Sequence, residues 1–277
     1  MQCLTSSARP PSARLSTKVR GLFVTGTDTD AGKTVVSAAL LAAMAAAGEQ
    51  VSAHKPVVTG LSDHRDGSGA LAWPADHELL GAAAGMEPEL VAPLRYGPAV
   101  SPHLAAELAG EEIDPASLIA CARRAGREAA GGTLIVEGVG GLLTPLAHEH
   151  TVCDLAVALG LPLLIAARPG LGTINHTLLT LHLARAAELQ VQAVVLTPWP
   201  QDPSRMERSN RSTIARLGEV RVATLAYVHS PEPGALADAG VGLLREMGLP
   251  ARSYETPARA AATTAAVTAS RSSSLIT

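Results

Sequence analysis

A nine-residue loop between an apolar segment and an Ala- and Leu-rich segment limits this chain to a small set of architectures. The loop reads Gly-Thr-Asp-Thr-Asp-Ala-Gly-Lys-Thr over residues 26–34, after an expected strand at 22–25 and before an expected helix over about 33–47. Backbone N–H groups at a helix N-terminus bind anions. We therefore predict a phosphate-binding loop in which Lys33 reaches the β- and γ-phosphates and the Thr34 hydroxyl binds Mg²⁺.

The spacing of this loop departs from the common phosphate-binding pattern, because five residues rather than four separate Gly26 from Gly32. A chance Gly-Lys-Thr at a helix start is the plain alternative. Switch GTPases need an Asn-Lys-x-Asp element, yet no lysine follows Lys55. Partitioning ATPases carry a second lysine at the position that Asp28 occupies here. Kinases of small metabolites remain open on the loop alone.

Short apolar segments alternate with helix-like segments along the chain, which indicates right-handed βαβ units. We expect an α/β, three-layer P-loop NTPase-like fold, with a mostly parallel sheet and helices on both faces. A single domain should cover residues 21–250, between a disordered extension (1–20) and a low-complexity disordered tail (251–277). The expected strands are 22–25, 51–58, 134–136, 161–166, 191–197 and 220–225. The expected helices are 33–47 (closed by Gly48), 76–85, one opening at Ser101-Pro102, 114–130, 151–159, 173–189, 202–217 and 233–247.

The composition argues against several classes of partner. A formal net charge of −3 and 2% aromatic residues give no reason to expect nucleic acid or an anionic membrane. The most apolar stretch, 35–48, is 14 residues long, whereas a membrane-spanning helix needs about 20. The first 20 residues lack the apolar region of a secretory signal, although their basic, Ser-rich character is shared by transit peptides. Three widely spaced cysteines fit a reducing cytoplasm.

Ligands bind at the carboxyl ends of the strands in such sheets, so residues just after the apolar segments are candidates for the site. Lys55 ends the second segment and is one of three lysines among 22 basic residues. A lysine there can follow a moving phosphoryl group, and an ordinary surface lysine is the alternative. Glu137 ends the third segment before a glycine run, an arrangement that places a carboxylate on Mg²⁺. The alternative is a glycine-rich turn with a solvated glutamate.

Two other places carry candidates of their own. Asp76 begins a helix after a polar loop and is either an N-cap or a third oxygen ligand for Mg²⁺, with Asp63 and Asp66 as competitors in the loop. The segment 170–176 opens a helix whose free N–H groups can bind a carboxylate. A glycine turn capped by Thr173 is the alternative there.

Taken together, four motifs in order resemble the dethiobiotin synthetase family. The family loop GTDTxxGKT is GTDTDAGKT here, and KPVxSG or KPVxTG is KPVVTG at residues 55–60. The family's VEGAGG is VEGVGG at 136–141, and LGxxNH is LGTINH at 171–176. Ser101-Pro102-His103 also matches a family segment. The resemblance covers roughly residues 21–250.

The resemblance implies an ATP-dependent cyclo-ligase of biotin biosynthesis, which forms dethiobiotin, ADP and phosphate from 7,8-diaminopelargonic acid, CO2 or bicarbonate, and ATP with Mg²⁺. It also implies a cytoplasmic homodimer with the active site near the interface. By position, the catalytic residues are Lys55 and Lys33, and the metal ligands are Thr34, Asp76 and Glu137. The nucleotide contacts are Asp30, Ala31, Gly32, Lys33, Thr34, Val35, Asp76, Glu137, Gly138, Val139, Gly140, Thr197 and Pro198. The substrate contacts are Thr29, Thr59, Gly172, Thr173, Ile174 and Asn175.

Three departures from the family pattern bear on these assignments. Asp30 stands where Glu or Gly is most common, and Val139 adds bulk in place of the Ala of VEGAGG. Many members carry an Asn-Asp pair after the fifth strand to read adenine, whereas this strand continues Leu196-Thr197-Pro198. A threonine lacks the amide that pairs with a purine edge, so we expect a looser nucleotide choice that includes CTP.

Two other functions are weighed against this one. Amidoligases of the cobyrinic acid type are usually longer and carry a glutaminase domain with a Cys nucleophile, and none of the three cysteines here lies in a strand-to-helix elbow. A nucleotide-switched partitioning ATPase would need the missing second loop lysine and often an amphipathic tail. The Ala/Thr/Ser-rich tail of this chain is poorly suited to that.

Overall fold

The computed structural model describes residues 20–62, 73–129 and 131–248. The expected extension, except for Arg20, and the whole of the expected tail lie outside these residues, as do Asp63 and Asp66. The central sheet consists of β1 Arg20–Gly26, β2 Val51–His54, β5 Thr133–Gly141, β8 Leu163–Ala167, β9 Val191–Trp199 and β10 Val222–Ala226. Its strand order is β10-β9-β8-β1-β5-β2, and every neighbouring pair is parallel.

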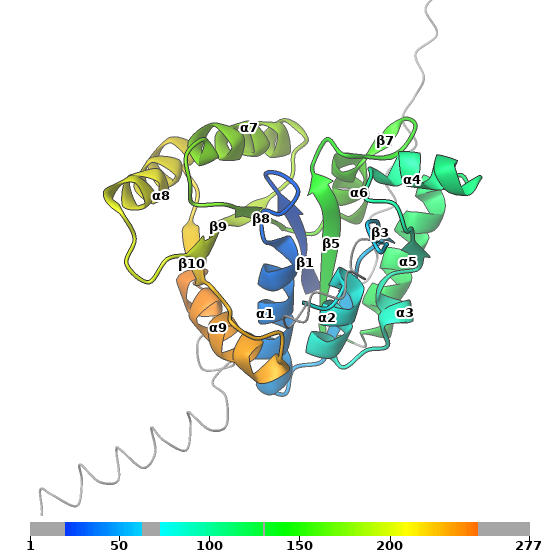
Figure 1. Ribbon diagram of the computed structural model, residues 1–277, viewed down its shortest axis with the longest axis horizontal. Helices are drawn as coiled ribbons and strands as arrows, with labels where there is room; N and C mark the ends of the chain where they lie inside the picture. Colours follow the sequence, from blue (N-terminus) through cyan, green and yellow to red (C-terminus); the bar gives the residue numbers. More distant parts are fainter. Residues whose placement is uncertain (1–19, 63–72, 130, 249–277) are drawn as a thin grey trace, which may run out of the picture.

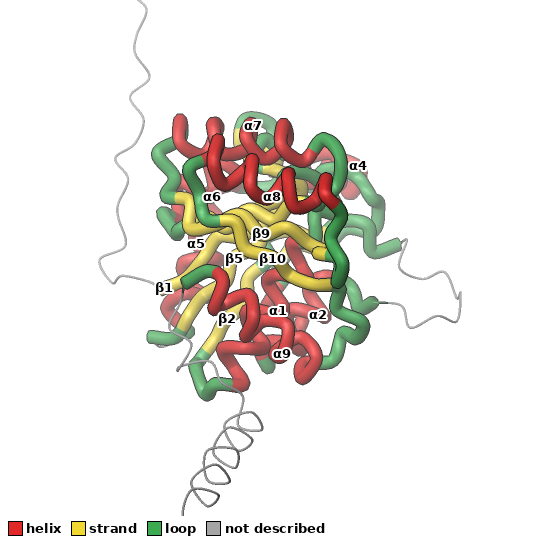
Figure 2. The backbone as a smooth tube through the Cα atoms, turned by 90° about the vertical axis from the view of Figure 1, so that its left-hand side faces the viewer, coloured by secondary structure: helices red, strands yellow, loops and turns green. Residues whose placement is uncertain are grey.

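Helices cover both faces of this sheet, as Figure 2 shows: α6, α7 and α8 lie on one side of the strands, and α1, α2 and α9 on the other. The nine helices of the described residues are α1 Lys33–Ala46, α2 Asp76–Ala84, α3 Pro88–Val91, α4 Pro102–Ala109, α5 Pro115–Glu128, α6 Val152–Leu159, α7 Thr173–Ala186, α8 Arg205–Gly218 and α9 Pro233–Glu246. The three-layer α/β fold expected from the sequence is therefore confirmed.

Alternation along each strand divides the interior into two hydrophobic cores. In β1, Leu22 and Val24 pack into the core that contains α1 and α9, whereas Phe23 packs into the core that contains α5 and α6. Successive strand side chains point to opposite faces, and both faces of a parallel sheet are covered, so these strands are apolar throughout. No helix among the described residues combines the length and the apolar character needed to span a bilayer.

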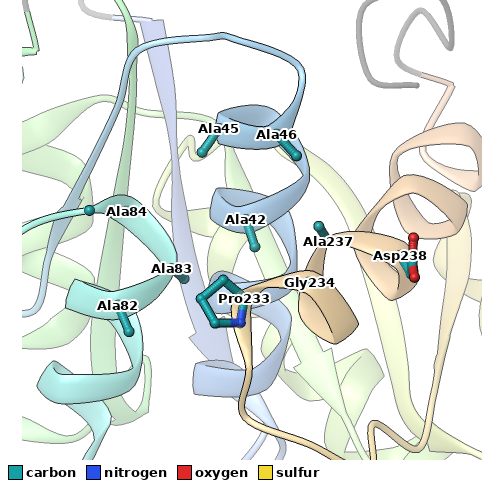
Figure 3. Close-up of a pocket in the computed structure, with 11 residues that line it drawn as sticks. Ala42, Ala45, Ala46, Ala82, Ala83, Ala84, Pro233, Gly234, Ala237 and Asp238 are labelled. Atoms are coloured by element: carbon teal, nitrogen blue, oxygen red, sulfur yellow. The ribbon is translucent and has the colours of Figure 1, made fainter. Parts of the chain in front are cut away.

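The chain has few aromatic residues, and its core is filled by small side chains that pack closely. A Cβ atom on Gly240 of α9 would lie 2.0 Å from the carbonyl oxygen of Ala39 in α1, so only glycine allows this approach. Beside this helix pair, a hollow of about 720 Å³ opens between α1, α2 and α9. Figure 3 shows that alanines such as Ala42 and Ala83 line it, and Asp238 is its one ionisable residue in the described chain. The described part of this lining contains no nucleophilic side chain and no positive charge that could bind a phosphate group.

The structure corrects the expected strand 51–58, which is two strands in two sheets. β2 ends at His54, and β3 (Val57–Val58) pairs instead with β4 (Leu94–Arg95). The break has a local cause, because Pro56 has no N–H and restricts the residue before it. The Lys55 N–H accordingly leaves the sheet and donates to the carbonyl of Val91 at 2.9 Å.

Smaller differences concern caps and short elements. Gly48 closes α1 as expected: it follows the C-cap Ala47 with φ 80°, and its N–H donates to the Ala45 carbonyl at 2.9 Å. Ser101 caps α4 only by its backbone, whereas Asp114 accepts from the N–H groups of Ala116 and Ser117 at the start of α5. The sequence did not predict the short elements α3, β4, β6 (Pro145–Ala147) and β7 (His150–Thr151).

Candidate functional site

The strand order brings the carboxyl ends of β1, β5 and β2 to one edge of the sheet (Figure 1), and the loops that leave them surround a cavity of about 700 Å³. Ten of its lining residues were candidates from the sequence: Thr29, Asp30, Gly32, Lys33, Thr34, Lys55, Thr59, Asp76, Val139 and Gly140. Five others were not recognised as site residues: Ala99, Val100, Ser101, Thr144 and Pro145. These are mainly small or apolar loop residues, so their types gave no chemical signal.

The phosphate-binding loop joins β1 to α1 in the predicted order. Gly32 is the N-cap of α1 with φ 84°, a left-handed conformation that glycine adopts without cost. Asp30 also has a positive φ of 55°. The Lys33 ammonium curls back over the loop and donates to the Asp28 carbonyl at 3.0 Å. Burial and the nearby Lys55 charge lower the pKa of Lys33.

Lys55 lies at the centre of the charged groups. Its ammonium is 2.6 Å from Asp76 Oδ2 and 2.6 Å from Glu137 Oε1. Burial alone would lower the pKa of Lys55, but the two carboxylates outweigh it and raise that pKa. Burial would likewise raise the pKa of Asp76, but Lys55 and the Thr34 hydroxyl lower it to about 2. Lys55 and Asp76 therefore hold each other in their charged forms.

Thr34 completes this cluster from the first turn of α1. Its hydroxyl oxygen lies 2.9 Å from Asp76 Oδ1 and 2.9 Å from Glu137 Oε1, and its single proton serves one acceptor at a time. The second oxygen of Glu137, Oε2, is buried and has no hydrogen-bond partner in the described chain. Two carboxylates, one of which has an unpartnered oxygen, and a hydroxyl supply the hard oxygen donors that Mg²⁺ prefers.

The cluster is incomplete as a metal cage. The described residues contain no group of three or more His, Cys, Asp or Glu side chains arranged to hold a metal ion. Mg²⁺ usually binds through one or two carboxylates together with phosphate oxygens and water. The residues present therefore fit a magnesium ion that arrives with a nucleotide.

The structure settles how Glu137 and Asp76 are positioned. β5 continues to Gly141, so Glu137 lies in mid-strand opposite Val24, and the expectation that it ends the strand was wrong. Asp76 is the first residue of α2 and not its cap. The cap position belongs to Ala75, whose N–H donates to the Glu78 carboxylate at 2.9 Å. The Asp76 carboxylate thus stays available to the site.

The remaining nucleotide candidates do not line the cavity in the described chain. Ala31 and Gly138 are buried, and a Cβ on Gly138 would lie 2.8 Å from Val152 Cγ1. Thr197 is buried and packs on the loop, since a Cβ on Gly32 would lie 2.5 Å from its methyl group. Pro198 is exposed beside it.

The four substrate candidates 172–175 lie apart from these groups, at the start of α7, and none lines the 700 Å³ cavity in the described chain. Gly172 is the N-cap with φ 90° and no side-chain cap bond. Thr173 is the first helical residue, and its hydroxyl lies 3.5 Å from that of Thr177, so the alternative of a Thr173 cap was wrong.

The sequence did not predict one contact of the phosphate-binding loop, which is made by Arg168. Arg168 follows β8 and donates from Nε to the Asp30 carbonyl at 3.0 Å. An arginine at the end of an apolar strand was a signal of the same kind as Lys55 and Glu137.

A loop of this sequence after a central strand of a parallel sheet, with Glu137 on the adjacent strand β5 and with Lys55 after β2, defines the class of P-loop nucleotide-binding proteins. Residues 20–229 match the family described as "AAA domain". The MinC:MinD cell division protein complex of Aquifex aeolicus has a similar fold, with a TM-score of 0.51 and 13% identity over 83% of this chain and 97% of that one.

Similar sequences narrow this class to one family. The ATP-dependent dethiobiotin synthetase BioD of Anaeromyxobacter sp. (strain Fw109-5) is 40% identical over 73% of this chain and 92% of its own length. The protein of the same name from Mycobacterium sp. (strain KMS) is 40% identical over 76% of this chain and 90% of its own length. The chain belongs to the dethiobiotin synthetase family.

Proposed function

We propose that this protein uses ATP to close the ureido ring of dethiobiotin on 7,8-diaminopelargonic acid and CO2. The observation that carries the proposal is the convergence of Lys33, Thr34, Lys55 and Asp76 on one cavity, with Glu137 buried in contact with Thr34 and Lys55. Membership of the dethiobiotin synthetase family supports the same conclusion.

The reaction needs three bond-forming steps. One amine of the substrate adds to CO2 and loses a proton, which gives a carbamate. A carbamate oxygen then attacks the γ-phosphorus of ATP, the bond to the bridging oxygen breaks, and ADP leaves. The second amine attacks the carbonyl carbon of this mixed anhydride and loses a proton, and inorganic phosphate departs as the ring closes. Little side-chain acid–base chemistry is required, so positioning and charge carry the catalysis.

Each charged residue has a place in this scheme. Lys33 neutralises the β- and γ-phosphates, and Lys55 follows the phosphoryl group from ADP to the carbamate. Thr34, Asp76 and Glu137 would hold Mg²⁺. When bound, that ion supplies further neutralisation of the phosphate charge. The Lys55 ammonium lines the cavity, where it can contact the reacting oxygens.

The diamine occupies the cavity beside Thr59, within reach of Lys55. Its carboxylate binds at the N-terminus of α7, where free N–H groups favour an anion. Since residues 172–175 do not line the cavity of their own chain, we assign this contact to the partner in a homodimer. Exposed leucines support such an interface: Leu171 is 95% exposed, Leu143 67% and Leu179 60%. Cys121 and Cys153 form no disulfide, which supports a cytoplasmic location.

Phosphate release tests the proposal directly. The purified protein is assayed with Mg²⁺, bicarbonate and ATP, with and without 7,8-diaminopelargonic acid. We expect release that depends on the diamine and disappears in Lys33→Ala and Lys55→Ala. Asp238→Asn, in the alanine-lined hollow, is the control that keeps full turnover. Release that ignores the diamine would leave only a P-loop ATPase, and no release with any nucleoside triphosphate would refute the assignment.

A further inference from the structure

Arg168 forms hydrogen bonds to the phosphate-binding loop from outside the cavity. Its Nε donates to the carbonyl of Asp30 at 3.0 Å, and its terminal nitrogen donates to the carbonyl of Thr29 at 3.4 Å. The same nitrogen lies 3.7 Å from the Asp30 carboxylate, in an exposed ion pair. Arg168 does not line the 700 Å³ cavity in the described chain. Its main contacts are therefore with two successive backbone carbonyls.

The direction of these carbonyls fixes the direction of two amide groups. In a trans peptide the C=O and the following N–H point in opposite directions. Because the carbonyls of Thr29 and Asp30 point to Arg168, the N–H groups of Asp30 and Ala31 point away from it. No hydrogen bond joins either N–H to another described residue. These two free donors belong to the set that we predicted to bind phosphate.

The hydrogen bonds from Arg168 also stabilise a backbone conformation of Asp30 that is unfavourable for a non-glycine residue. Asp30 has φ 55°, and within the loop it is the one described non-glycine residue with a positive φ. A non-glycine residue in this left-handed region costs roughly 1 kcal/mol, although Asp tolerates it better than most. The two hydrogen bonds from Arg168 oppose relaxation to a right-handed conformation, which would turn both amides.

The segment that follows Arg168 is held in place by hydrogen bonds from helix α8. Asn210 of α8 is buried, and its Nδ2 donates to the carbonyls of Pro169 at 2.9 Å and Gly170 at 3.2 Å. At the other side of the loop, the Thr27 N–H donates to the Ala166 carbonyl at 3.0 Å, which ties the loop to β8. The guanidinium thus projects from a fixed base.

We propose that Arg168 is a positioning residue for triphosphate binding: by holding the Thr29 and Asp30 carbonyls, it presets the N–H groups of Asp30 and Ala31 toward the phosphates before the nucleotide arrives. It contacts no reacting atom. This inference rests on the proposed function only in that the ligand is a nucleoside triphosphate, and inorganic tripolyphosphate probes it without the base or the diamine.

Three variants separate hydrogen bonding from charge. Arg168→Ala removes both donor nitrogens. Arg168→Lys keeps the positive charge but has a single ammonium group in place of the two donor nitrogens. Arg168→Gln keeps a hydrogen-bond donor without the charge. Calorimetry with Mg²⁺-ATP and with tripolyphosphate should show Kd about tenfold weaker for Arg168→Ala, because charged hydrogen bonds of this kind are lost. The Lys and Gln variants should fall between. KM for ATP should rise in parallel, with a smaller fall in kcat and no change in KM for the diamine.

Arg124→Ala is the matched control, because Arg124 on α5 is 64% exposed and Arg168 58%. Arg124 forms a surface pair with Glu128 at 3.9 Å and contacts the Cys121 sulfur at 4.0 Å, both within its own helix. Truncation of so exposed a side chain leaves the fold intact, which a melting curve verifies. Kd within twofold of wild type in Arg168→Ala would overturn the proposal. So would a Gln variant as weak as Ala beside a Lys variant equal to wild type, since charge alone would then explain the effect. Failure of the proposed function is seen separately, as tight ATP binding by the wild type without diamine-dependent phosphate release.

Discussion

The Lys55 ammonium and the Glu137 carboxylate form a 2.6 Å ion pair in which the two side chains are only 4% and 0% exposed. Such a pair is costly to break from one side, because the remaining charge stays buried without compensation. The Lys55 ammonium of this pair lines the same cavity as the phosphate-binding loop, at the carboxyl edge of the sheet. We expect the pair to contribute to both stability and catalysis, and the two effects can be measured separately.

Lys55→Met should destabilise the protein by about 3–5 kcal/mol, since Glu137 loses its partner. The double variant Lys55→Met/Glu137→Gln removes both charges and should recover most of this loss, yet remain inactive. Urea denaturation measures the stability, and phosphate release measures the turnover. A double variant as unstable as the single one would show that the pair is not what stabilises this region.

Gly32→Ala should weaken both folding and nucleotide binding. The φ of 84° is strained for alanine, and the new Cβ would lie 2.5 Å from the Thr197 methyl group. The conformational term alone is about 1–2 kcal/mol. Adding Thr197→Ser removes the methyl group and should restore part of the stability, but not the part due to φ. Equal stability of Gly32→Ala and wild type in thermal unfolding would contradict the left-handed cap.

His54 should make the fold sensitive to mild acid. Burial and then the Arg124 charge lower its pKa to about 4, and neither ring nitrogen has a partner in the described chain. Between pH 6.5 and 4 the unfolded chain binds a proton that the folded chain does not, so the stability falls as the pH falls. The loss from this group is roughly 3 kcal/mol at most. His54→Leu should flatten the stability–pH curve in that window, and an unchanged curve would refute the role of His54.

The choice of nucleotide should be loose. Thr197 is buried against Gly32, and Pro198 has no N–H to offer a base. Neither residue supplies the paired donor and acceptor that would read adenine. We expect CTP to support diamine-dependent phosphate release and to compete with ATP at similar concentrations. A strong preference for ATP over CTP, GTP and UTP in competition assays would sink this prediction.

The proposed homodimer should depend on the leucines beside the start of α7. Leu171→Glu and Leu179→Glu place charges on side chains that are 95% and 60% exposed in the single chain. We expect monomers in sedimentation experiments, with a raised KM for the diamine. Leu90→Glu on α3, at 67% exposure, is the control that should stay dimeric. Dimers that persist in both α7 variants would place the interface elsewhere.

Much of the site follows from sequence because parallel strands share one carboxyl edge. Lys55 and Glu137 follow apolar segments, so their meeting could be predicted before the structure. The break at Pro56 could not, because the apolar pattern runs on through Val57 and Val58 and hides the change of sheet.

Other features depend on which strands are neighbours, and local sequence does not record this. The reach of Arg168 to Asp30 requires that β8 lie beside β1. The packing of Thr197 on Gly32 likewise joins residues that are far apart in the chain. Only the strand order and the loop conformations together reveal such contacts.

The strand order has a consequence for the chain as it leaves the ribosome. β5 lies between β1 and β2, and it begins at Thr133, long after both have been translated. Until then neither strand can pair with β5, and Lys55 cannot form its ion pair with Glu137. Unpaired apolar strands are prone to associate with other chains. The interval between the translation of His54 and that of Gly141 is therefore the period in which a nascent chain most needs protection from aggregation.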